Sequence, residues 1–576
     1  MEIRLTKEIS KEKISTIILS FLKKEKVNYI FGIHGGYTIG FGNEMNNFPE
    51  IRFIRCQHEE GAAFMADGFA RTSGKFGVVL TTAGPGLSNT FTGIISSFAD
   101  GIPVMLLSGA IPKDKAFKGA IQDTESFNMN ISLSIREATR FHADIFYKDS
   151  FLQYFRNGIR YLFKGKKGPV FFNIGAELFS SEIEHSQEYF RHYEDHFFDQ
   201  IAADHIIEVI RSSRSMLIIA GHGVMQSNAR DEVQNFAELL RVPVMVTPKG
   251  KSSFNHESQY FIGVFGAGSN IIPEEYLKNE TIETILAIGT SFNEFSSNAW
   301  SSFLAKTEKI IQIDIDPYII GRSFPNTYGI VGNAKTIINY LYNKIKNNKF
   351  NGFKHLDSEG KIKYYKQNFE NILNPQLIKS GSVPLKVPRL LDDIYNSFYP
   401  YELNIFNDNG SCIFWVGHYL KLKKDWNYYI SLGFSSMGYA IPAAIGGAIG
   451  APARVTVAFT GDGAALMNGN ELKTAAEYNV PVFFFVLNDA RLGIVHHSTN
   501  IIYNKPVPGV SFSKSVNFVT FAQSLGVDAY RIEKPGDINL EFIKKLIEKK
   551  KPVLFDCIID PEEIAPIGSR LNQVNK

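Results

Sequence analysis

Two acidic residues stand directly after two successive apolar runs in the last third of the chain. Asp462 lies between Gly461 and Gly463 at the end of one run, and Asp489 follows the run 481–487. Because ligands bind at the carboxyl ends of parallel strands, we expect the two carboxylates to meet at one sheet edge. Two carboxylates and a backbone carbonyl are oxygen ligands that Mg²⁺ accepts while it keeps a phosphate. The spacing predicts a metal-bridged diphosphate site, with two ordinary helix-capping aspartates as the alternative.

These residues need strands and helices to position them. Strand-like runs, glycine turns and helix-like runs alternate along the chain, as in the strand 77–82, the turn 83–86 and the helix 87–98. This alternation predicts an α/β protein with three doubly wound parallel-sheet domains. A helix is expected over 9–24 and a polar linker over 180–196. The expected domain boundaries are 1–185, 196–345, a linker at 346–387, and 388–576.

Composition excludes several classes of function. The 61 basic and 58 acidic residues of the 576-residue chain nearly cancel, so no nucleic-acid partner is expected. Hydrophobic residues at 44% and charged residues at 21% are typical of globular proteins. The three cysteines lack the spacing of a disulfide framework or a zinc site. Charges interrupt the N-terminal segment and no apolar run approaches roughly 20 residues, so we expect a cytoplasmic protein without an export signal or a membrane partner.

Four segments resemble one enzyme family. The stretch GDGAALMNGNELKTAAEYNVPVFFFVLND (461–489) is similar to the diphosphate and Mg²⁺ motif of thiamine diphosphate-dependent enzymes, especially acetolactate synthases. The stretches 57–71 and TTAGPGLSNTFTGI (81–94) resemble the first domain of that superfamily, which includes pyruvate decarboxylases and benzaldehyde lyase. LGFSSMGYAIPAAIGGAIG (432–450) resembles its aminopyrimidine-binding segment. The resemblance implies pyrimidine-binding, middle and diphosphate-binding domains, in that order.

The resemblance also implies roles for individual residues. Glu59 would hydrogen-bond the aminopyrimidine, although an acid at a helix N-terminus is the structural alternative. Met437 would wedge beneath a bent cofactor, with core filling as its alternative. The expected metal ligands are Asp462, Asp489 and the backbone carbonyl of Arg491. The expected cofactor-binding residues are Pro85, Asn89, Asn409, Gly410, Ser435, Met437, Gly461, Asp462, Gly463, Ala464, Asp489, Gly493 and Ile494.

Candidate catalytic residues of the first domain follow its first strand. Gly36 and Tyr37 lie where acetolactate synthases carry a glycine pair near the reacting carbon, and small residues there let a substrate approach the backbone. His34 stands in an FGIHGG turn similar to that of benzaldehyde lyase, but Tyr37 replaces that enzyme's second histidine. A hydrogen-bonded structural role is the alternative for His34. Gln122 matches the active-site glutamine of acetolactate synthases.

Two departures from acetolactate synthases concern the acceptor substrate. Phe295 stands where biosynthetic enzymes carry an arginine near a second 2-keto acid, so a cationic clamp for a carboxylate is missing. Ser498 replaces their specificity tryptophan. The neighbouring His497 is a catalytic candidate and His496 is its companion, while surface exposure is the alternative for one of the pair.

The resemblance implies thiamine diphosphate- and Mg²⁺-dependent decarboxylation of a 2-keto acid, pyruvate first, with transfer of the acyl unit to a carbonyl acceptor. A simple 2-keto acid decarboxylase, an acyloin lyase and a non-catalytic homologue remain alternatives. We expect no FAD, although biosynthetic relatives hold it in the middle domain. A homodimer or a dimer of dimers is implied, with Glu59 and Asp462 of one site on different chains.

Overall fold

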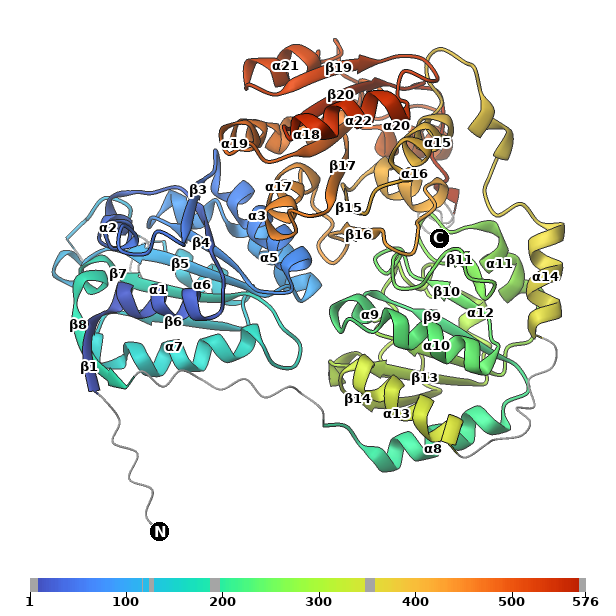
Figure 1. Ribbon diagram of the computed structural model, residues 1–576, viewed down its shortest axis with the longest axis horizontal. Helices are drawn as coiled ribbons and strands as arrows, with labels where there is room; N and C mark the ends of the chain where they lie inside the picture. The colour runs from blue at the N-terminus through green and yellow to red at the C-terminus, as the bar shows by residue number, and fades with distance from the viewer. Residues whose placement is uncertain (1–8, 117, 124–128, 187–196, 348–357, 569–576) are drawn as a thin grey trace.

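The chain is described by a computed structural model that covers residues 9–116, 118–123, 129–186, 197–347 and 358–568. Each of its three domains is built on one parallel sheet of six strands (Figure 1). No helix within these ranges is both long and apolar enough to cross a membrane.

The first domain has the strand order β3-β2-β4-β5-β7-β6. Its strands are β1 (Ile9–Lys13), β2 (Tyr29–Gly32), β3 (Arg52–Arg55), β4 (Gly77–Thr81), β5 (Val104–Ala110), β6 (Phe141–Ile145), β7 (Val170–Gly175) and β8 (Glu182–Ser186). Its helices are α1 (Ile14–Lys24), α2 (Ile39–Met45), α3 (Glu59–Ser73), α4 (Pro85–Ser88), α5 (Phe91–Asp100), α6 (Ile131–Arg136) and α7 (Phe151–Ile159).

The expected helix over 9–24 is wrong in its first five residues. Residues 9–13 form β1, which pairs antiparallel with β8 inside the segment expected to be a linker. Helical spacing of apolar residues begins only at Ile14, and the polar residues of 9–13 take their strand structure from pairing with β8. The residues 187–196 of the expected linker lie outside the described ranges.

The middle domain has the strand order β11-β10-β9-β12-β13-β14. Its strands are β9 (Met216–Ala220), β10 (Val244–Val246), β11 (Phe261–Val264), β12 (Thr284–Ile288), β13 (Lys309–Asp314) and β14 (Thr327–Val331). Its helices are α8 (Gln200–Ser212), α9 (His222–Gln226), α10 (Arg230–Leu240), α11 (Ile271–Asn279), α12 (Ser302–Ala305), α13 (Ala334–Asn347) and α14 (Ser358–Asn368). Helix α14 lies in the stretch expected to be a linker, yet its Ile362 and Tyr365 are buried in the middle core.

The third domain has the strand order β16-β15-β17-β18-β20-β19. Its strands are β15 (Leu403–Asn407), β16 (Asn427–Ile430), β17 (Val455–Gly461), β18 (Val482–Asn488), β19 (Asp528–Ile532) and β20 (Val553–Ile558). Its helices are α15 (Val387–Phe398), α16 (Ser411–Tyr419), α17 (Ala440–Gly450), α18 (Asp462–Asn468), α19 (Leu472–Glu477), α20 (Gly493–Tyr503), α21 (Phe518–Ser524) and α22 (Leu540–Lys549).

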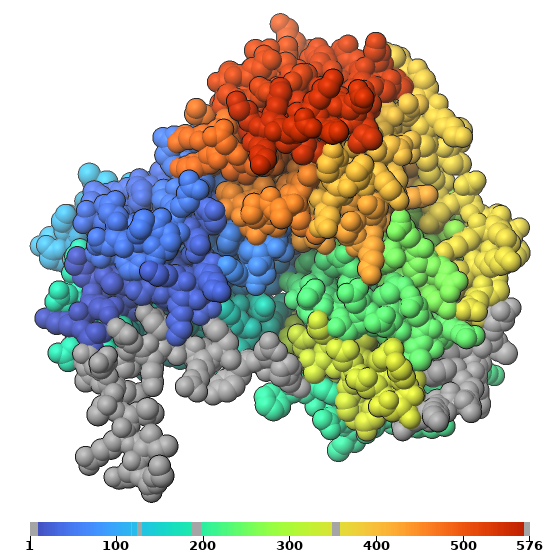
Figure 2. Space-filling model, viewed as in Figure 1, coloured from blue at the N-terminus to red at the C-terminus, as the bar shows by residue number. Residues whose placement is uncertain are grey.

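One hydrophobic core spans the first and third domains, and a second lies within the middle domain. A third core covers the other face of the third sheet and includes Ala267 of the middle domain. Figure 2 shows the orange part of the third domain between the blue and green lobes. Helices α3 and α17 cross at this shared core (Figure 1). A Cβ on Gly68 would lie 1.9 Å from the carbonyl oxygen of Ala443, and one on Gly446 would lie 1.9 Å from that of Met65. Only glycine permits so close a crossing.

Candidate active site

Two acidic side chains meet at one edge of the third sheet. Asp462 opens α18 directly after β17, and Asp489 directly follows β18. The two strands are parallel neighbours, with Gly461 opposite Leu487. A Cβ on Gly493 would lie 2.6 Å from Asp489 Oδ2, so glycine leaves room for that carboxylate. The geometry brings together the two strand-end aspartates as the sequence predicted.

The electrostatics of this pair fit a divalent cation. Burial raises the pKa of Asp462 to about 6. Burial, and then the nearby Asp462 carboxylate, raise the pKa of Asp489 to about 7. Gly463 N–H donates to Asp462 Oδ1 at 2.7 Å, but the buried Asp462 Oδ2 has no hydrogen-bond partner among the described residues. A cation that binds both carboxylates removes this cost.

The protein would supply few ligands to such a cation. No three His, Cys, Asp or Glu side chains gather in metal-binding geometry within the described ranges. The side chain of Arg491 is engaged elsewhere, because Nη1 contacts His496 Nε2 at 3.0 Å and Nη2 donates to Glu562 at 3.3 Å. Arg491 can therefore contribute only its backbone carbonyl. This leaves coordination positions for the phosphate oxygens and water that Mg²⁺ usually keeps.

Met437 lies beside the aspartate turn. A Cβ on Gly463 would lie 3.5 Å from Met437 Cε, so the thioether reaches the 461–463 segment. Met437 is only partly buried, which argues against simple core filling. Its loop is held by Asn409, whose Nδ2 donates to the carbonyl of Ser436 at 2.6 Å and whose Oδ1 accepts from Ser435 Oγ at 2.8 Å.

Glu59 is the first residue of α3 and is 8% exposed. Asn89 Nδ2 donates to its Oε2 at 2.9 Å. The glycine turn after β4 also faces it, since a Cβ on Gly86 would lie 3.5 Å from Glu59 Oε1. The adjacent Glu60 Oε1 accepts from Asn468 Nδ2 at 3.5 Å, at the end of the short helix that Asp462 opens. The predicted acid therefore lies where the first and third domains of this one chain meet.

The substrate candidates of the first domain divide into two groups. Gln122 packs against the turn after β4, where its Oε1 lies 3.4 Å from Thr82 Oγ1, and Tyr37 OH donates to the Ile121 carbonyl at 2.8 Å. The position of a Cβ on Gly36 is open space. In contrast, the ring of His34 stacks on Phe53 at 4.0 Å and its Nδ1 lies 3.4 Å from Thr38 Oγ1. These contacts favour the structural alternative for His34.

The two histidines of α20 also differ. His496 contacts Arg491 and, through Nδ1, Ser511 Oγ at 3.3 Å. His497 is 6% exposed, burial lowers its pKa, and its Nε2 has no hydrogen-bond partner in the described part of the chain. His497 is therefore the member of the pair with an unused polar atom.

Comparison with known proteins gives the same three-part division. The family model of the thiamine pyrophosphate enzymes matches residues 12–129 as the N-terminal TPP binding domain, 203–341 as the central domain and 408–557 as the C-terminal TPP binding domain. The chain belongs to the thiamine pyrophosphate enzyme family. It is thus a thiamine diphosphate-dependent enzyme whose TPP-binding domains contain Glu59 and the two aspartates.

Curated relatives of this thiamine pyrophosphate enzyme are similar along nearly their whole length. A probable acetolactate synthase large subunit of Methanocaldococcus jannaschii is 30% identical, with 97% of this chain and 94% of that protein covered. One from Methanococcus aeolicus is 28% identical over the same shares. The acetolactate synthase large subunit of Haemophilus influenzae is 25% identical, with 97% of each chain covered.

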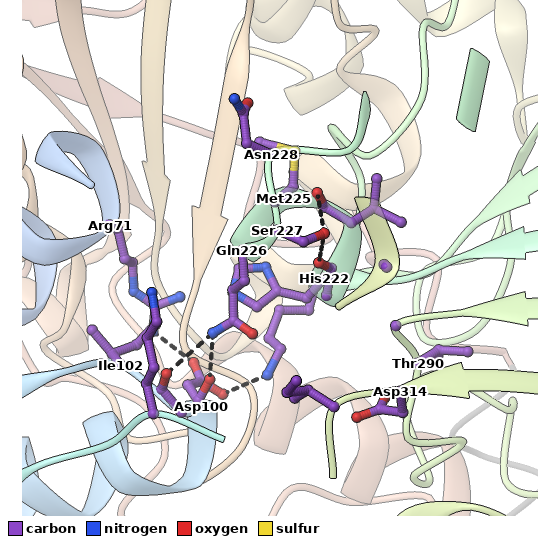
Figure 3. A pocket seen from close by; sticks show the side chains of 18 of the residues that line it. Arg71, Asp100, Ile102, His222, Met225, Gln226, Ser227, Asn228, Thr290 and Asp314 are labelled. Carbon is purple, nitrogen blue, oxygen red and sulfur yellow. Dashed lines mark hydrogen bonds and ion pairs between the residues drawn. The ribbon is translucent and has the colours of Figure 1, made fainter. Parts of the chain in front are cut away.

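The middle domain of this thiamine pyrophosphate enzyme borders a cavity of about 1550 Å³, where all three domains meet (Figure 3). His222 and Thr290 line it just beyond the carboxyl ends of β9 and β12. Asp314 lines it at the end of β13, and burial raises the pKa of this carboxyl to about 6. The cavity lies at the strand ends of an open α/β sheet, where such sheets bind ligands.

Two buried acids at the site escaped prediction from the sequence. Asp408 accepts hydrogen bonds from the backbone N–H groups of Gly438 and Ala440, which fixes the start of α17. Glu471 accepts from the backbone N–H groups of Gln57 and His58, just before Glu59. Asp408 directly precedes Asn409, a predicted cofactor-binding residue, and this position was the available sequence signal for it. No local pattern reveals a partner more than 400 residues away.

Proposed function

We propose that the enzyme uses Mg²⁺ and thiamine diphosphate to decarboxylate a 2-keto acid, pyruvate first, and to transfer the acyl unit to a carbonyl acceptor. The observation that carries the proposal is the pairing of buried Asp462, whose Oδ2 has no hydrogen-bond partner among the described residues, with the partly buried Asp489, beside Met437. The acetolactate synthase names of the relatives support the substrate class. When bound, thiamine diphosphate supplies an electron sink next to the substrate carbonyl.

The residues of the chain would divide the remaining work. Asp462, Asp489 and the carbonyl of Arg491 would bind the cation and so anchor the diphosphate. The Glu59 carboxyl would exchange a proton with the aminopyrimidine, and the Met437 thioether would support the bent cofactor. Gln122 and the open space at Gly36 would receive the substrate on the side of the first domain.

A product assay tests this proposal. Purified protein is incubated with pyruvate, Mg²⁺ and thiamine diphosphate, with and without an added aldehyde, and the products are identified by mass spectrometry. We expect an acyloin or a 2-hydroxy-2-methyl-3-keto acid. Omission of Mg²⁺ or of thiamine diphosphate is the control and should remove the product.

A simple 2-keto acid decarboxylase is the second candidate, because Phe295 removes a clamp for a carboxylate acceptor. Free acetaldehyde without any ligated product would favour it. The histidine pair that pyruvate decarboxylases carry after their second strand is absent from the stretch 111–122, and this argues for ligation. An acyloin lyase would instead cleave the ligated product when it is supplied as substrate.

We also propose that the enzyme works without FAD, as a cytoplasmic homodimer or dimer of dimers. The Asn488-Asp489 pair, which resembles the flavin-free catabolic acetolactate synthases, supports the first point, and three buried free cysteines are consistent with the cytoplasm. The size of the middle cavity makes a direct test necessary, because it could hold a dinucleotide. Purified protein should lack the visible absorption of a flavin.

A further inference from the structure

One face of helix α5 contacts the segment that precedes α17, which we call the 432–437 loop. Ser96 Oγ lies 3.1 Å from Ser436 Oγ. One helical turn later, Asp100 Oδ1 accepts from the backbone N–H of Gly433 at 2.9 Å. Residues four apart lie on the same face of a helix, so Ser96 and Asp100 act on the two ends of the loop together.

Asp100 is the point where side chains and backbone of all three domains converge (Figure 3). The Asp100 side chain is fully buried. Its carboxylate accepts from Arg71 Nη2 of the first domain at 2.7 Å and from Lys249 Nζ of the middle domain at 2.8 Å. Gln226 Nε2, also of the middle domain, donates to the Asp100 carbonyl at 3.1 Å. With Gly433 N–H, the carboxylate thus has partners from three domains.

The loop is shaped to accept this carboxylate. A Cβ on Gly433 would lie 2.6 Å from Asp100 Oδ1 and 2.8 Å from the Ala99 backbone. Any other residue at 433 would push the loop away from α5. Although burial opposes ionisation, Lys249 and Arg71 hold the pKa of Asp100 well below its ordinary value. The hydrogen bond to Gly433 is therefore charge-assisted at neutral pH.

We propose that Asp100 is a positioning residue that sets the 432–437 loop for thiamine diphosphate. The inference rests on the proposed function, since Ser435 and Met437 of this loop are the residues expected to hold the cofactor. Asp100 acts through its hydrogen bond to the backbone of Gly433, and Lys249 of the middle domain holds the Asp100 carboxylate in place.

The matched variants are Asp100→Ala, Asp100→Asn and Asp316→Asn. The first removes the acceptor of Gly433 N–H, whereas the second keeps a side-chain oxygen for it and removes the charge. Asp316 serves as the control because its 2.7 Å ion pair with Lys166 also joins the first and middle domains, but belongs to the middle-domain cavity rather than to the loop. Calorimetry with the full chain, stripped of cofactor, measures thiamine diphosphate binding in excess Mg²⁺.

We expect Asp100→Ala to bind thiamine diphosphate at least roughly tenfold more weakly, the size expected for the loss of a charge-assisted hydrogen bond. Its kcat at saturating cofactor should stay within about threefold of wild type. Asp100→Asn, which keeps an acceptor for Gly433 N–H but no charge, should bind with an affinity between those of the alanine variant and wild type, and Asp316→Asn should be unchanged. If the alanine variant does not fold, Ser96→Ala replaces it and should weaken binding in the same direction.

Three results would overturn the inference. The first is unchanged binding in Asp100→Ala, or in Ser96→Ala where that replaces it. The second is equal weakening in Asp316→Asn, which would indicate general loosening between domains. The third is a wild-type protein that binds no thiamine diphosphate, which would also remove the proposed function. If wild type is active and binds thiamine diphosphate, the proposed function stands. The binding of the variants then tests the role of Asp100 by itself.

Discussion

The meeting of two acidic side chains at one sheet edge could be predicted from short motifs. Asp462 and Asp489 follow strands that could be read from their apolar runs, and the structure brings them to one sheet edge. His34 illustrates the limit, because its stacking on Phe53 depends on a residue 19 positions away. A glycine turn predicts that a histidine is near a site but leaves the direction of its ring open.

Replacement of Glu59 by glutamine is the decisive test at the residue scale. The amide keeps the shape of the side chain but cannot exchange the proton that the aminopyrimidine needs. We expect kcat to fall at least about 100-fold, which is the scale of a lost general acid–base group. Thiamine diphosphate affinity, measured by calorimetry, should change little.

Glu60→Gln is the matched control for that test. Glu60 is the next residue of α3, and its carboxylate accepts a long hydrogen bond of 3.5 Å from Asn468 Nδ2. Its variant should retain nearly full activity. Equal activity of Glu59→Gln and wild type would refute the role assigned to Glu59.

At the scale of elements, the strands and helices of the three α/β domains were largely readable from apolar periodicity, and the pairing of β1 was not. β1 finds its partner about 170 residues away, and its polar residues carry no strand signal of their own. Helix α14 was missed because, of its eleven residues, only Ile362 and Tyr365 are both apolar and buried. Short polar elements take their structure from tertiary contacts that periodicity does not record.

The crossing of α3 and α17 makes an element-scale prediction. Gly68→Ala or Gly446→Ala should lower the free energy of unfolding by about 1–3 kcal/mol, because a Cβ would overlap a backbone carbonyl of the other helix. Urea unfolding measures this change. Gly381→Ala is the control, since its Cβ would point into open space, and it should stay within about 0.5 kcal/mol of wild type. Wild-type stability in both α3 and α17 variants would contradict the tight crossing.

At the scale of the whole molecule, buried histidines tie the middle domain to the third. His418 of α16 accepts from Leu373 N–H at 2.8 Å, and its Nδ1 contacts the Ser269 carbonyl at 2.7 Å. His256 contacts the Lys251 carbonyl at 2.7 Å, and its Nδ1 accepts from Leu422 N–H of the third domain at 3.4 Å. Burial lowers the pKa of His418 to about 4 and that of His256 to about 3. Both are therefore neutral in the folded protein at pH 5.

This neutrality predicts a loss of stability in mild acid. The unfolded chain takes up protons on these histidines as the pH falls below about 6.5, whereas the folded chain does not, so the stabilisation present above that pH is lost toward pH 4. Between pH 7 and pH 5 each histidine should lower the free energy of unfolding by about 2 kcal/mol. Buried carboxyls with a raised pKa, such as Asp462 and Asp489, act in the opposite direction, so the histidine share is read from the difference between wild type and a histidine variant. Urea titrations at the two pH values measure it.

His418→Gln should remove one share of that pH dependence, since glutamine does not titrate. His205→Gln, at an exposed position of α8, should leave it intact. The same pH dependence in His418→Gln and wild type would contradict the prediction.

Exposed apolar side chains beside the site predict the assembly. Phe434, Leu466 and Met467 are 48%, 49% and 56% exposed, next to the loop and helix expected to hold the cofactor. If a second copy covers them, the double variant Leu466→Lys, Met467→Lys should sediment as a monomer while wild type sediments as a dimer or tetramer. Tyr318→Lys, at an exposed position of the middle domain, should not alter the assembly. A monomeric wild type would refute the predicted dimer.

The shared core of the first and third domains has a consequence for how such enzymes diversify. Helix α3, which Glu59 opens, and helix α17, which follows the loop of Met437, both pack in that common core, while most of the middle domain packs in a core of its own. Remodelling of the middle domain that keeps its contacts with the third domain and a cation at Asp100 would therefore leave this crossing of α3 and α17 in place. The middle domain can thus change which further ligand it binds without a change in the residues proposed for catalysis.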